Sequence, residues 1–457
     1  MTVQDSVHRS LRSHLATGAG RLARGASRAL GRGSGGMIGG EVALALDPRV
    51  LAELAAGRRS VTVTGTNGKS TTTRMVRAAL AAIPSRAGSA PGRVASNTNG
   101  DNMPSGIVTA LMATPDAPLA ALEVDEMHLP VVARDVDPEV MVLLNLSRDQ
   151  LDRVGEIGTV ERRLREAVLA HPGSTVVANC DDPLIASAAW DSGRVVWVAA
   201  GSGWGADSVG FPRGGRVVRD EGGPWRVVSD AEAATGYRRP DPDWWLEDAD
   251  PGTTADARPE SGARAVLRGP DGVRADLRLS LPGRANLGNA AQAVAAAVSM
   301  GARAEDAAAA VGAVREVAGR YAHYDVDGRD VRMMLAKNPA GWQEALTMVD
   351  ADADQVVVAV NGQVADGQDL SWLWDVDFAV LETGRPRRII ATGERGADLG
   401  VRMEYAGLSW ERARTPMEAI ARCRPGHVEL LANYTAFRDL RRALDDRGAS
   451  AGEEASR

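Results

Sequence analysis

One short segment constrains the fold of this chain more than any other. Val and Thr alternate over residues 61–64, a pattern typical of a strand, and the run GTNGKSTTT follows at once. Gly65 and Gly68 allow a tight turn, and the Ser/Thr run begins a helix near Thr71. In such a turn the backbone N–H groups converge on phosphate oxygens, and the helix N-terminus adds a partial positive charge. The segment therefore predicts a phosphate-binding loop between a strand and a helix, within an α/β fold.

The same loop supplies most of the residues predicted to bind ATP. Lys69 is expected to reach the terminal phosphates, and the hydroxyl of Ser70 is expected to bind Mg²⁺. An ordinary Gly-rich turn is the alternative. Lys69 is one of only two lysines in 457 residues, because nearly all other basic residues are Arg. A lysine in such a chain suggests a task that needs the compact point charge of an ammonium group, which Arg does not offer. The loop residues predicted to contact ATP are Gly65, Thr66, Asn67, Gly68, Lys69, Ser70 and Thr71.

Composition excludes several classes of protein. The net charge of -7 and the pI of about 5.6 give no reason to expect nucleic acid as a partner. The two cysteines, Cys180 and Cys423, are too few for a disulfide framework or a Cys-based zinc site. We expect buried thiols in a reducing cytoplasm. No apolar run approaches the ~20 residues that span a bilayer.

The N-terminal 1–57 is predicted to be a basic helical and linker segment. Its first 40 residues carry six Arg against one acid, Asp5, interleaved with Leu11, Leu15, Leu22 and Leu30. No apolar core of signal-peptide length is present, so a cytoplasmic location is expected. Two interpretations stay open. The segment is a basic amphipathic helix that contacts anionic lipid at the inner face of the plasma membrane, or a leading helix with a solvated basic face.

Strand and helix signals alternate from residue 59 onward, which indicates a parallel sheet flanked by helices. The predicted central ATP-binding domain spans 58–317. It contains an insertion at about 200–262, predicted to form hairpins and a flexible acidic loop. A smaller α/β domain is predicted over 318–446, with Phe378–Leu381 among its strands. The tail, 447–457, is predicted to be disordered.

Two further segments carry candidate site residues. Glu123 ends an apolar strand, where phosphate-loop folds place a Mg²⁺ ligand, and Asp125 and Glu126 are alternatives. The alternative to metal binding is that each of these three acids is simply a solvated residue at the end of a strand. Asn286 and Asn289 share a face at the start of an Ala-rich helix, where N-capping suffices to explain one of them.

These pieces, in this order, resemble the Mur ligase family, whose members form amide bonds through acyl phosphates. The matching motifs are TGTNGKST, NCDDP at 179–183, GRANLGN at 283–289 and GR at 319–320. The resemblance implies a Mur-ligase-like central domain followed by a Rossmann-like C-terminal domain. It also implies that Asn286 or Asn289 contacts adenine and that Arg320 contacts ATP phosphate.

Segments such as LAKNPAGWQEAL (335–346) and ADGQDLSWLWDVDF (365–378) resemble one branch of the family, the MurT-type subunit of lipid II isoglutaminyl synthase. This branch implies ATP- and Mg²⁺-dependent amidation of the D-glutamate α-carboxyl in the lipid II stem peptide. Ammonia would come from a partner subunit, a GatD-type glutamine amidotransferase. The resemblance further implies that Lys337 faces the active site and that Asp366 or Asp369 completes the partner's Cys–His pair.

The chain departs at one place from the general Mur ligase pattern and at another from the pattern of MurT-type chains. Gln150 stands where the usual Mur ligase has His, although MurT-type chains share the Gln. The insertion resembles a zinc ribbon in which Phe211, Gly214, Glu232 and Thr235 stand at the four cysteine positions, so no structural zinc is predicted. Packing through Trp225 and Tyr237 is expected to hold the hairpins instead.

Two other functions are weighed against this one. The first is a Mur-type or folylpolyglutamate-type amino-acid ligase that needs no partner; Gln150 and the DGxDxSWxWD segment argue against it. The second is a non-enzymatic nucleotide-binding scaffold, against which the intact Lys69, Ser70 and Glu123 argue.

Overall fold

The computed structural model describes residues 10–29, 37–83, 92–97, 101–148, 157–202, 208–220, 223–229, 233–252, 262–315, 321–367, 369–382 and 386–455. The chain divides into two compact units. Unit 1 comprises Met1–Ser147, Glu156–Gly252 and Gly262–Arg315, and unit 2 comprises Arg148–Gly155, Thr253–Ser261 and Glu316–Arg457. Among the described residues, no helix has the length and apolar character to cross a membrane.

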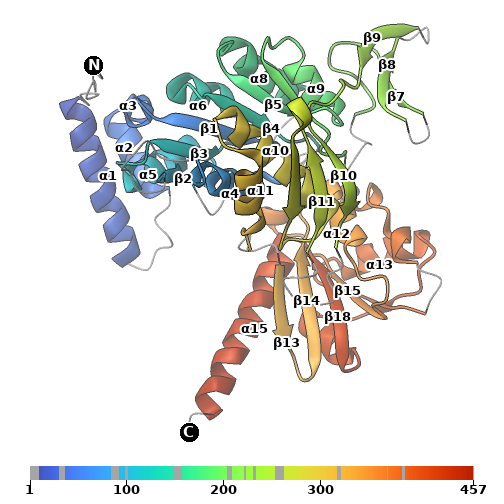
Figure 1. Cartoon of the computed structure of the whole chain (residues 1–457). Coiled ribbons are helices and arrows are strands. Elements are labelled where there is room, and N and C mark those ends of the chain that lie inside the picture. The colour runs from blue at the N-terminus through green and yellow to red at the C-terminus, as the bar shows by residue number, and fades with distance from the viewer. Residues whose placement is uncertain are drawn as a thin grey trace. The chain divides into compact units, whose positions relative to one another are not determined.

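Unit 1 is built on a six-stranded, all-parallel sheet with the strand order β2-β3-β1-β4-β5-β6 (Figure 1). Its strands are β1 (Arg59–Thr64), β2 (Val94–Ser96), β3 (Leu119–Glu123), β4 (Val140–Leu143), β5 (Thr175–Asn179) and β6 (Val195–Val198). Every residue of β3 and β4 is buried, and because successive strand residues point to opposite faces, both faces of the sheet are covered. The α/β fold predicted from the alternation of signals is confirmed.

The helices of unit 1 fall into groups that contact one another. α4 (Lys69–Ala81), α10 (Arg284–Ser299) and α11 (Ala304–Gly312) pack together, as do α6 (Leu129–Val136), α8 (Ile157–Ala170) and α9 (Pro183–Ala189). A third group contains α1 (Leu11–Ala29), α2 (Ile38–Leu46), α3 (Val50–Ala55) and α5 (Pro104–Ala113).

The predicted insertion contains a three-stranded antiparallel sheet of β7 (Arg216–Arg219), β8 (Trp225–Val228) and β9 (Ala234–Arg238). The rings of Phe211 and Tyr237 lie 4.9 Å apart between centroids, and Trp225 is buried in the same cluster. The Trp225 indole N–H donates to the carbonyl of Cys180, at 2.9 Å. Trp225 and Tyr237 thus pack as expected, and Phe211, at a position where the zinc-ribbon resemblance would place a cysteine, joins them.

The prediction of a flexible acidic loop within the insertion is wrong over residues 245–250. These residues form β10 (Trp245–Asp250), which pairs antiparallel with β11 (Arg264–Arg268), and β11 pairs with β12 (Arg274–Arg278) across the short helical turn η2 (Pro270–Gly272). The acids do not prevent strand formation because they meet cross-strand arginines: Glu247 accepts a 2.8 Å hydrogen bond from Arg268.

Unit 2 contains a second six-stranded sheet, in the order β13-β14-β18-β15-β16-β17, in which only β13 runs antiparallel to its neighbour. The strands are β13 (Tyr321–Asp325), β14 (Arg329–Leu335), β15 (Gln355–Ala359), β16 (Arg388–Thr392), β17 (Glu411–Arg412) and β18 (Gly426–Ala432). The helices are α12 (Pro339–Thr347), α13 (Gly396–Tyr405), α14 (Pro416–Arg422) and α15 (Tyr434–Ala455), with short helical turns η3 (Val364–Asp366), η4 (Ser371–Trp374) and η5 (Phe378–Leu381).

Two predictions for this half of the chain are corrected. Phe378–Leu381 is the helical turn η5 and not a strand, since Asp377 caps it and the buried Phe378 and Leu381, three residues apart, share one side of the turn. The segment predicted to be a disordered tail continues α15 as far as Ala455, because helix-forming Arg, Ala and Glu residues outnumber its glycines.

Candidate functional site

The phosphate loop follows β1 and ends at the first residue of α4, as predicted. Gly65 has φ +137° and Gly68, the N-cap of α4, has φ +84°, a region that favours glycine. A Cβ on Gly65 would stand 2.9 Å from the carbonyl oxygen of Asn145, and one on Gly68 would stand 2.8 Å from Oδ1 of Asn289. Glycine is therefore required at both positions by backbone conformation and by space.

Residues just past β4 hold the loop in place. The side chain of Asn145 accepts a hydrogen bond from the Asn67 N–H (2.9 Å) and donates one to the Asn67 carbonyl (3.0 Å). Its backbone carbonyl accepts from the Thr66 N–H, at 2.8 Å. Ser147 donates its N–H to the Thr66 hydroxyl, and that hydroxyl donates back to the Ser147 carbonyl. Only a weak signal in the sequence marks Asn145, namely an amide directly after a strand that neighbours β1.

The ammonium group of Lys69 lies within the loop. Its Nζ donates to the carbonyls of Gly65 (2.6 Å) and Thr66 (3.3 Å) and forms a 3.1 Å ion pair with Glu126. Both partners of this ion pair are largely buried, which strengthens their attraction. The loop thus holds one cation beside the first turn of α4, where Ser70 and Thr71 lie.

The three candidate acids after β3 have different environments. Glu123 is buried, and its backbone N–H and C=O bond the side chain of Asn97. It is the register partner of Val63, so it lies at the end of the strand beside the phosphate loop. Glu126 pairs with Lys69, and Asp125 lies 3.0 Å from His128. Of the three acids, Glu123 is thus the one that stands within β3 itself, beside β1, which leads into the loop.

The two asparagines of α10 are both buried but differ in surroundings. Asn286 donates to the carbonyl of Pro282 (2.6 Å). Asn289 lies against Gly68, as the space around that glycine shows. One turn further along, Gln292 donates to the carbonyl of Leu143, at 2.9 Å, which fixes α10 to β4. N-capping, the structural alternative for one of these residues, is not seen, since the N-cap of α10 is Gly283 without a side-chain bond.

The NCDDP segment is structural. Asp182 caps α9 through the N–H groups of Leu184 and Ile185 and also accepts from the Leu146 N–H, at 2.8 Å. Burial raises the pKa of this carboxyl to about 6. Burial likewise raises the pKa of the neighbouring Cys180 thiol to about 12, consistent with the expected inert thiol.

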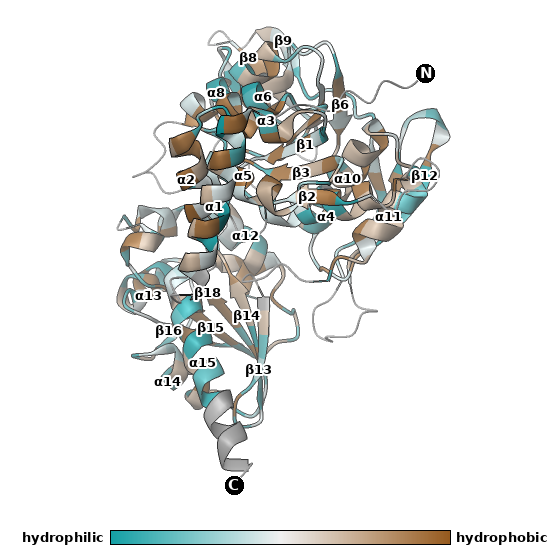
Figure 2. Cartoon of the chain, turned by 90° about the vertical axis from the view of Figure 1, so that its left-hand side faces the viewer, coloured by the Kyte–Doolittle hydropathy of each residue, from teal (hydrophilic) through white to brown (hydrophobic). Residues whose placement is uncertain are grey.

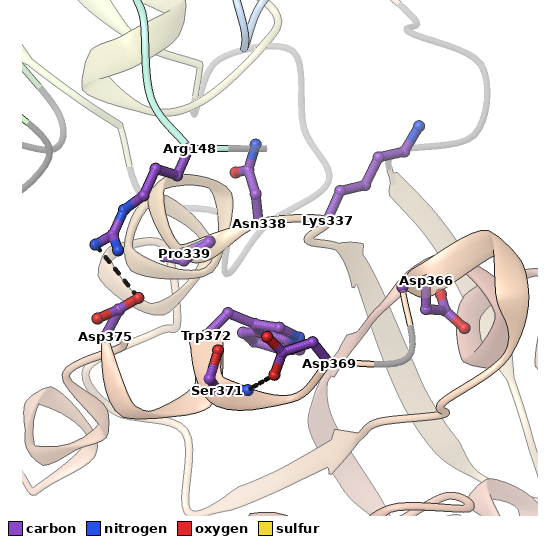
Figure 3. Close-up of a pocket in the computed structure, with 10 residues that line it drawn as sticks. Arg148, Lys337, Asn338, Pro339, Asp366, Asp369, Ser371, Trp372 and Asp375 are labelled. Carbon is purple, nitrogen blue, oxygen red and sulfur yellow. Dashed lines mark hydrogen bonds and ion pairs between the residues drawn. The ribbon is translucent and has the colours of Figure 1, made fainter. Parts of the chain in front are cut away.

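A separate pocket lies in unit 2, and the DGxDxSWxWD segment forms much of it (Figure 3). It holds about 450 Å³ of empty space, part of it open to solvent. Lys337 lines it with its Nζ 5.1 Å from the ring centroid of Tyr434, and in the view of Figure 3 this side chain extends away from both aspartates. Asn338 caps α12 beside it. The full lining is Arg148, Lys337, Asn338, Pro339, Asp366, Gly367, Asp369, Ser371, Trp372 and Asp375.

The two candidate aspartates of this pocket have different environments. Asp366 is buried and accepts hydrogen bonds from both the backbone N–H and the hydroxyl of Thr435, in the first turn of α15. Asp369 is exposed, and one of its oxygens accepts from the Ser371 N–H, at 2.8 Å. The carboxylate of Asp366 is therefore occupied by hydrogen bonds within the fold, whereas Asp369 presents its carboxylate to solvent.

Several predicted positions lie outside the described residues, namely Arg320, Gln150 and Glu232. Within the described part of the chain, no three His, Cys, Asp or Glu side chains gather closely enough to hold a metal ion. A divalent cation at Ser70 and Glu123 would therefore need oxygens from the nucleotide as well, as Mg²⁺ in phosphate-transfer sites usually does.

Comparison with known proteins connects both halves of the chain to one family. Residues 63–202 match the family model described as the Mur ligase middle domain, and residues 335–437 match the one described as MurT ligase C-terminal. The chain is 28% identical to the "Lipid II isoglutaminyl synthase (glutamine-hydrolyzing) subunit MurT" of Streptococcus pneumoniae, over 96% of this chain and 98% of that protein. It is 27% identical to the subunit of the same name from Staphylococcus aureus, over 84% and 86% respectively.

Solved structures agree with this placement at the level of the fold. A MurF crystal structure from Acinetobacter baumannii superimposes with a TM-score of 0.64 at 18% identity, over 89% of this chain and 80% of that one. Folylpolyglutamate synthase of Mycobacterium tuberculosis, complexed with ADP and AMPPCP, superimposes with a TM-score of 0.58 at 15% identity, over 86% and 93%.

Proposed function

We propose a function from one premise: the chain belongs to the Mur ligase family, and its C-terminal domain is of the MurT type. It is an ATP-dependent carbon–nitrogen ligase, the synthetase subunit of a lipid II isoglutaminyl synthase. It amidates the α-carboxyl of D-glutamate in the lipid II stem peptide, giving D-isoglutamine. The observation that carries the proposal is the joint presence of an intact phosphate loop and a MurT-type C-terminal domain.

The chemistry follows from the low reactivity of a carboxylate toward ammonia. Transfer of the γ-phosphoryl group of ATP to the carboxylate gives an acyl phosphate and ADP. Ammonia then attacks the acyl carbon, phosphate leaves, and the amide is formed. During transfer, negative charge is spread over the phosphoryl oxygens. Preorganised cations and N–H groups stabilise this charge in the transition state.

The residues of the loop are suited to this task. Lys69 carries its charge at the start of α4, next to the backbone N–H groups of the loop, and Asn145 fixes the loop through its two bonds to Asn67. We assign Ser70 and Glu123 to Mg²⁺, which, when bound, would neutralise phosphate charge. Thr66, Thr71, Asn286, Asn289 and Arg320 complete the proposed ATP site.

In unit 2, Lys337 is a lining residue of the pocket, and a phosphate or carboxylate group is the ligand that its charge fits. The ammonia source is a glutaminase partner of the GatD type, since the S. pneumoniae relative is named as a glutamine-hydrolyzing subunit. We assign Asp369 as the carboxylate that orients the partner's histidine, because it is exposed and Asp366 is not.

Exposed aromatic residues, one of them in the same DGxDxSWxWD segment as Asp369, support a partner interface. Trp374 is 55% exposed and Tyr405 is 75% exposed, and their rings meet edge to face at 5.2 Å. Arg402 holds the loop beneath them through the carbonyls of Leu373 and Val376. Exposed aromatic side chains beside an arginine are the residue types that dominate binding energy in protein interfaces.

The test is ATP turnover with lipid II, comparing ammonium with glutamine, with and without a GatD-type partner. We expect ammonium to suffice for the chain alone and glutamine to work only with the partner. Lys69→Met should lower kcat by about 10² or more with either donor, since a preorganised charge is lost. Incorporation of an amino acid without any partner would instead identify an ordinary Mur-type ligase.

A matched pair of substitutions separates the roles of the two aspartates. Asp369→Asn should abolish glutamine-dependent amidation and spare the ammonium-dependent reaction. Asp366→Asn should weaken the cap of α15 and cost about 1 kcal/mol of stability, with both donors affected alike. A loss of the ammonium reaction in Asp369→Asn would show that this residue supports the fold and does not serve the partner.

A further inference from the structure

The first helix of unit 1 packs in an unusual way. The face of α1 that contacts α2 consists of small residues, and Ser13, Ala16 and Thr17 are buried there together with Gly20. A Cβ on Gly20 would stand 2.5 Å from the carbonyl oxygen of Gly39, so the two helix backbones approach closely. A helix of a globular protein normally turns its large apolar side chains toward the core. In α1 the small residues take that place.

The large apolar residues of α1 lie on the opposite side. Leu11, Leu15 and Leu22 are 82%, 71% and 77% exposed. Their spacings of four and seven residues place them on one helix face. In Figure 2, α1 faces the viewer, with hydrophobic and hydrophilic residues alternating along it. A single exposed leucine needs no explanation, but three on one face form an apolar stripe that water does not favour.

Basic side chains border this stripe. α1 contains four Arg and no acidic residue, in a chain whose net charge is -7. Arg12 and Arg21 are exposed, and each is anchored by a hydrogen bond to a backbone carbonyl, that of Leu46 (2.8 Å) and that of Met112 (3.0 Å). These two bonds attach α1 to α2 and to the end of α5. The charges therefore keep fixed positions beside the leucines.

We propose that this face of α1, the leucine stripe of Leu11, Leu15 and Leu22 with its bordering arginines, binds an anionic lipid surface. The leucines enter the boundary between headgroups and acyl chains, and the arginines remain at the level of the phosphates. The helix lies in the plane of the surface, since its other face is packed on α2. This proposal chooses between the two interpretations that the sequence leaves open.

Charge complementarity selects this occupant over a second copy of the chain. Two copies meeting through the same face would bring Arg12 and Arg21 of each copy together, four like charges, which costs free energy, since α1 carries no acid to offset them. An anionic bilayer supplies the opposite charge along with an apolar layer. The proposal rests on the proposed function in one respect: a lipid-linked substrate gives the enzyme a reason to occupy that surface.

The experiment is sedimentation of the full chain with vesicles of phosphatidylcholine alone and of phosphatidylcholine mixed with phosphatidylglycerol, without nucleotide or partner. The test variant combines Leu11→Gln, Leu15→Gln and Leu22→Gln, which keep helix propensity and alter only exposed positions. The control variant combines Val131→Gln and Leu169→Gln, at residues of unit 1 that are 43% and 52% exposed and lie on α6 and α8.

We expect the wild type and the control to bind mixed vesicles and the triple variant to bind at least about tenfold more weakly. Binding should fall as salt is raised, because salt screens the arginines. Equal binding by the triple variant, or equal wild-type binding to neutral vesicles, overturns the proposal. A concentration-dependent dimer that the triple variant loses would identify a second copy as the occupant and overturn it too.

A second measurement keeps this proposal distinct from the proposed function. The triple variant should amidate a soluble substrate analogue that lacks the lipid tail at the wild-type rate, yet show a raised KM for substrate in vesicles. If neither protein amidates either substrate, the proposed function fails and the vesicle result stands on its own. An unchanged KM in vesicles overturns the membrane role of α1.

Discussion

Gly68→Ala tests the geometry of the proposed nucleotide site directly. The added Cβ lowers the free energy of unfolding in two separate ways. An L-residue in the left-handed region, at φ +84°, costs about 1–2 kcal/mol. Contact with the amide of Asn289, at 2.8 Å from Oδ1 and 3.0 Å from Nδ2, adds about 1–3 kcal/mol of overpacking. The sum is about 2–5 kcal/mol of lost stability, large against a typical total of about 5–15 kcal/mol.

A double-mutant cycle separates the two costs. Asn289→Ala removes the atoms that the new methyl group meets, so in the Gly68→Ala/Asn289→Ala protein only the backbone cost should remain. We expect the double variant to be about 1–3 kcal/mol more stable than the sum of the single effects predicts. The free energies of unfolding are measured in urea by tryptophan fluorescence, and ATP binding by calorimetry.

A matched control isolates the backbone term. Gly272 has φ +77°, and a Cβ there would meet no atom within 4 Å, so Gly272→Ala should cost only about 1–2 kcal/mol. Additive effects of Gly68→Ala and Asn289→Ala, within about 0.5 kcal/mol, would refute the reasoning, because they would show that Asn289 does not touch the loop.

The remaining predictions concern buried groups. Glu429→Gln leaves the Arg332 guanidinium buried without its anionic partner, 2.7 Å away, and should cost about 3–5 kcal/mol in urea unfolding; a change below about 1 kcal/mol would contradict this. A hydrogen bond to Glu429 raises the pKa of His427, so the protonated imidazole stabilises the folded state. This contribution to the free energy of unfolding should be complete below pH 6.5 and should be lost as the pH rises through the folded-state pKa. Urea unfolding across that range should show the fall, and a His427→Gln protein should lack it. Burial raises the pKa of both Cys180 and Cys423, so iodoacetamide should label neither thiol until the chain unfolds; labelling at the rate of a free thiol in the native protein would show that they are accessible.

Local patterns were sufficient for the strand and the helix of unit 1 that flank the Gly-rich loop. The alternation of Val61 to Thr64 and the glycines at 65 and 68 predicted a strand, a turn and a helix, and these are β1, the loop and α4. Such features depend on neighbouring residues and on the φ values they allow. The same reasoning failed for Phe378–Leu381 and for residues 245–250, because a short apolar run and a short acidic run take their conformation from the surfaces they meet.

The sequence by itself determined a Gly-rich loop of the phosphate-binding type, with one of the chain's two lysines in it, and a resemblance to ATP-dependent ligases of the Mur family. Only the tertiary structure decided how similar residues divide their tasks. Glu126 pairs with Lys69 while Glu123 stays at the end of β3, Asp366 caps α15 while Asp369 faces solvent, and the leucines of α1 point outward. The physical reason is that these differences arise from contacts between residues far apart in the chain, and such contacts depend on strand order and helix packing.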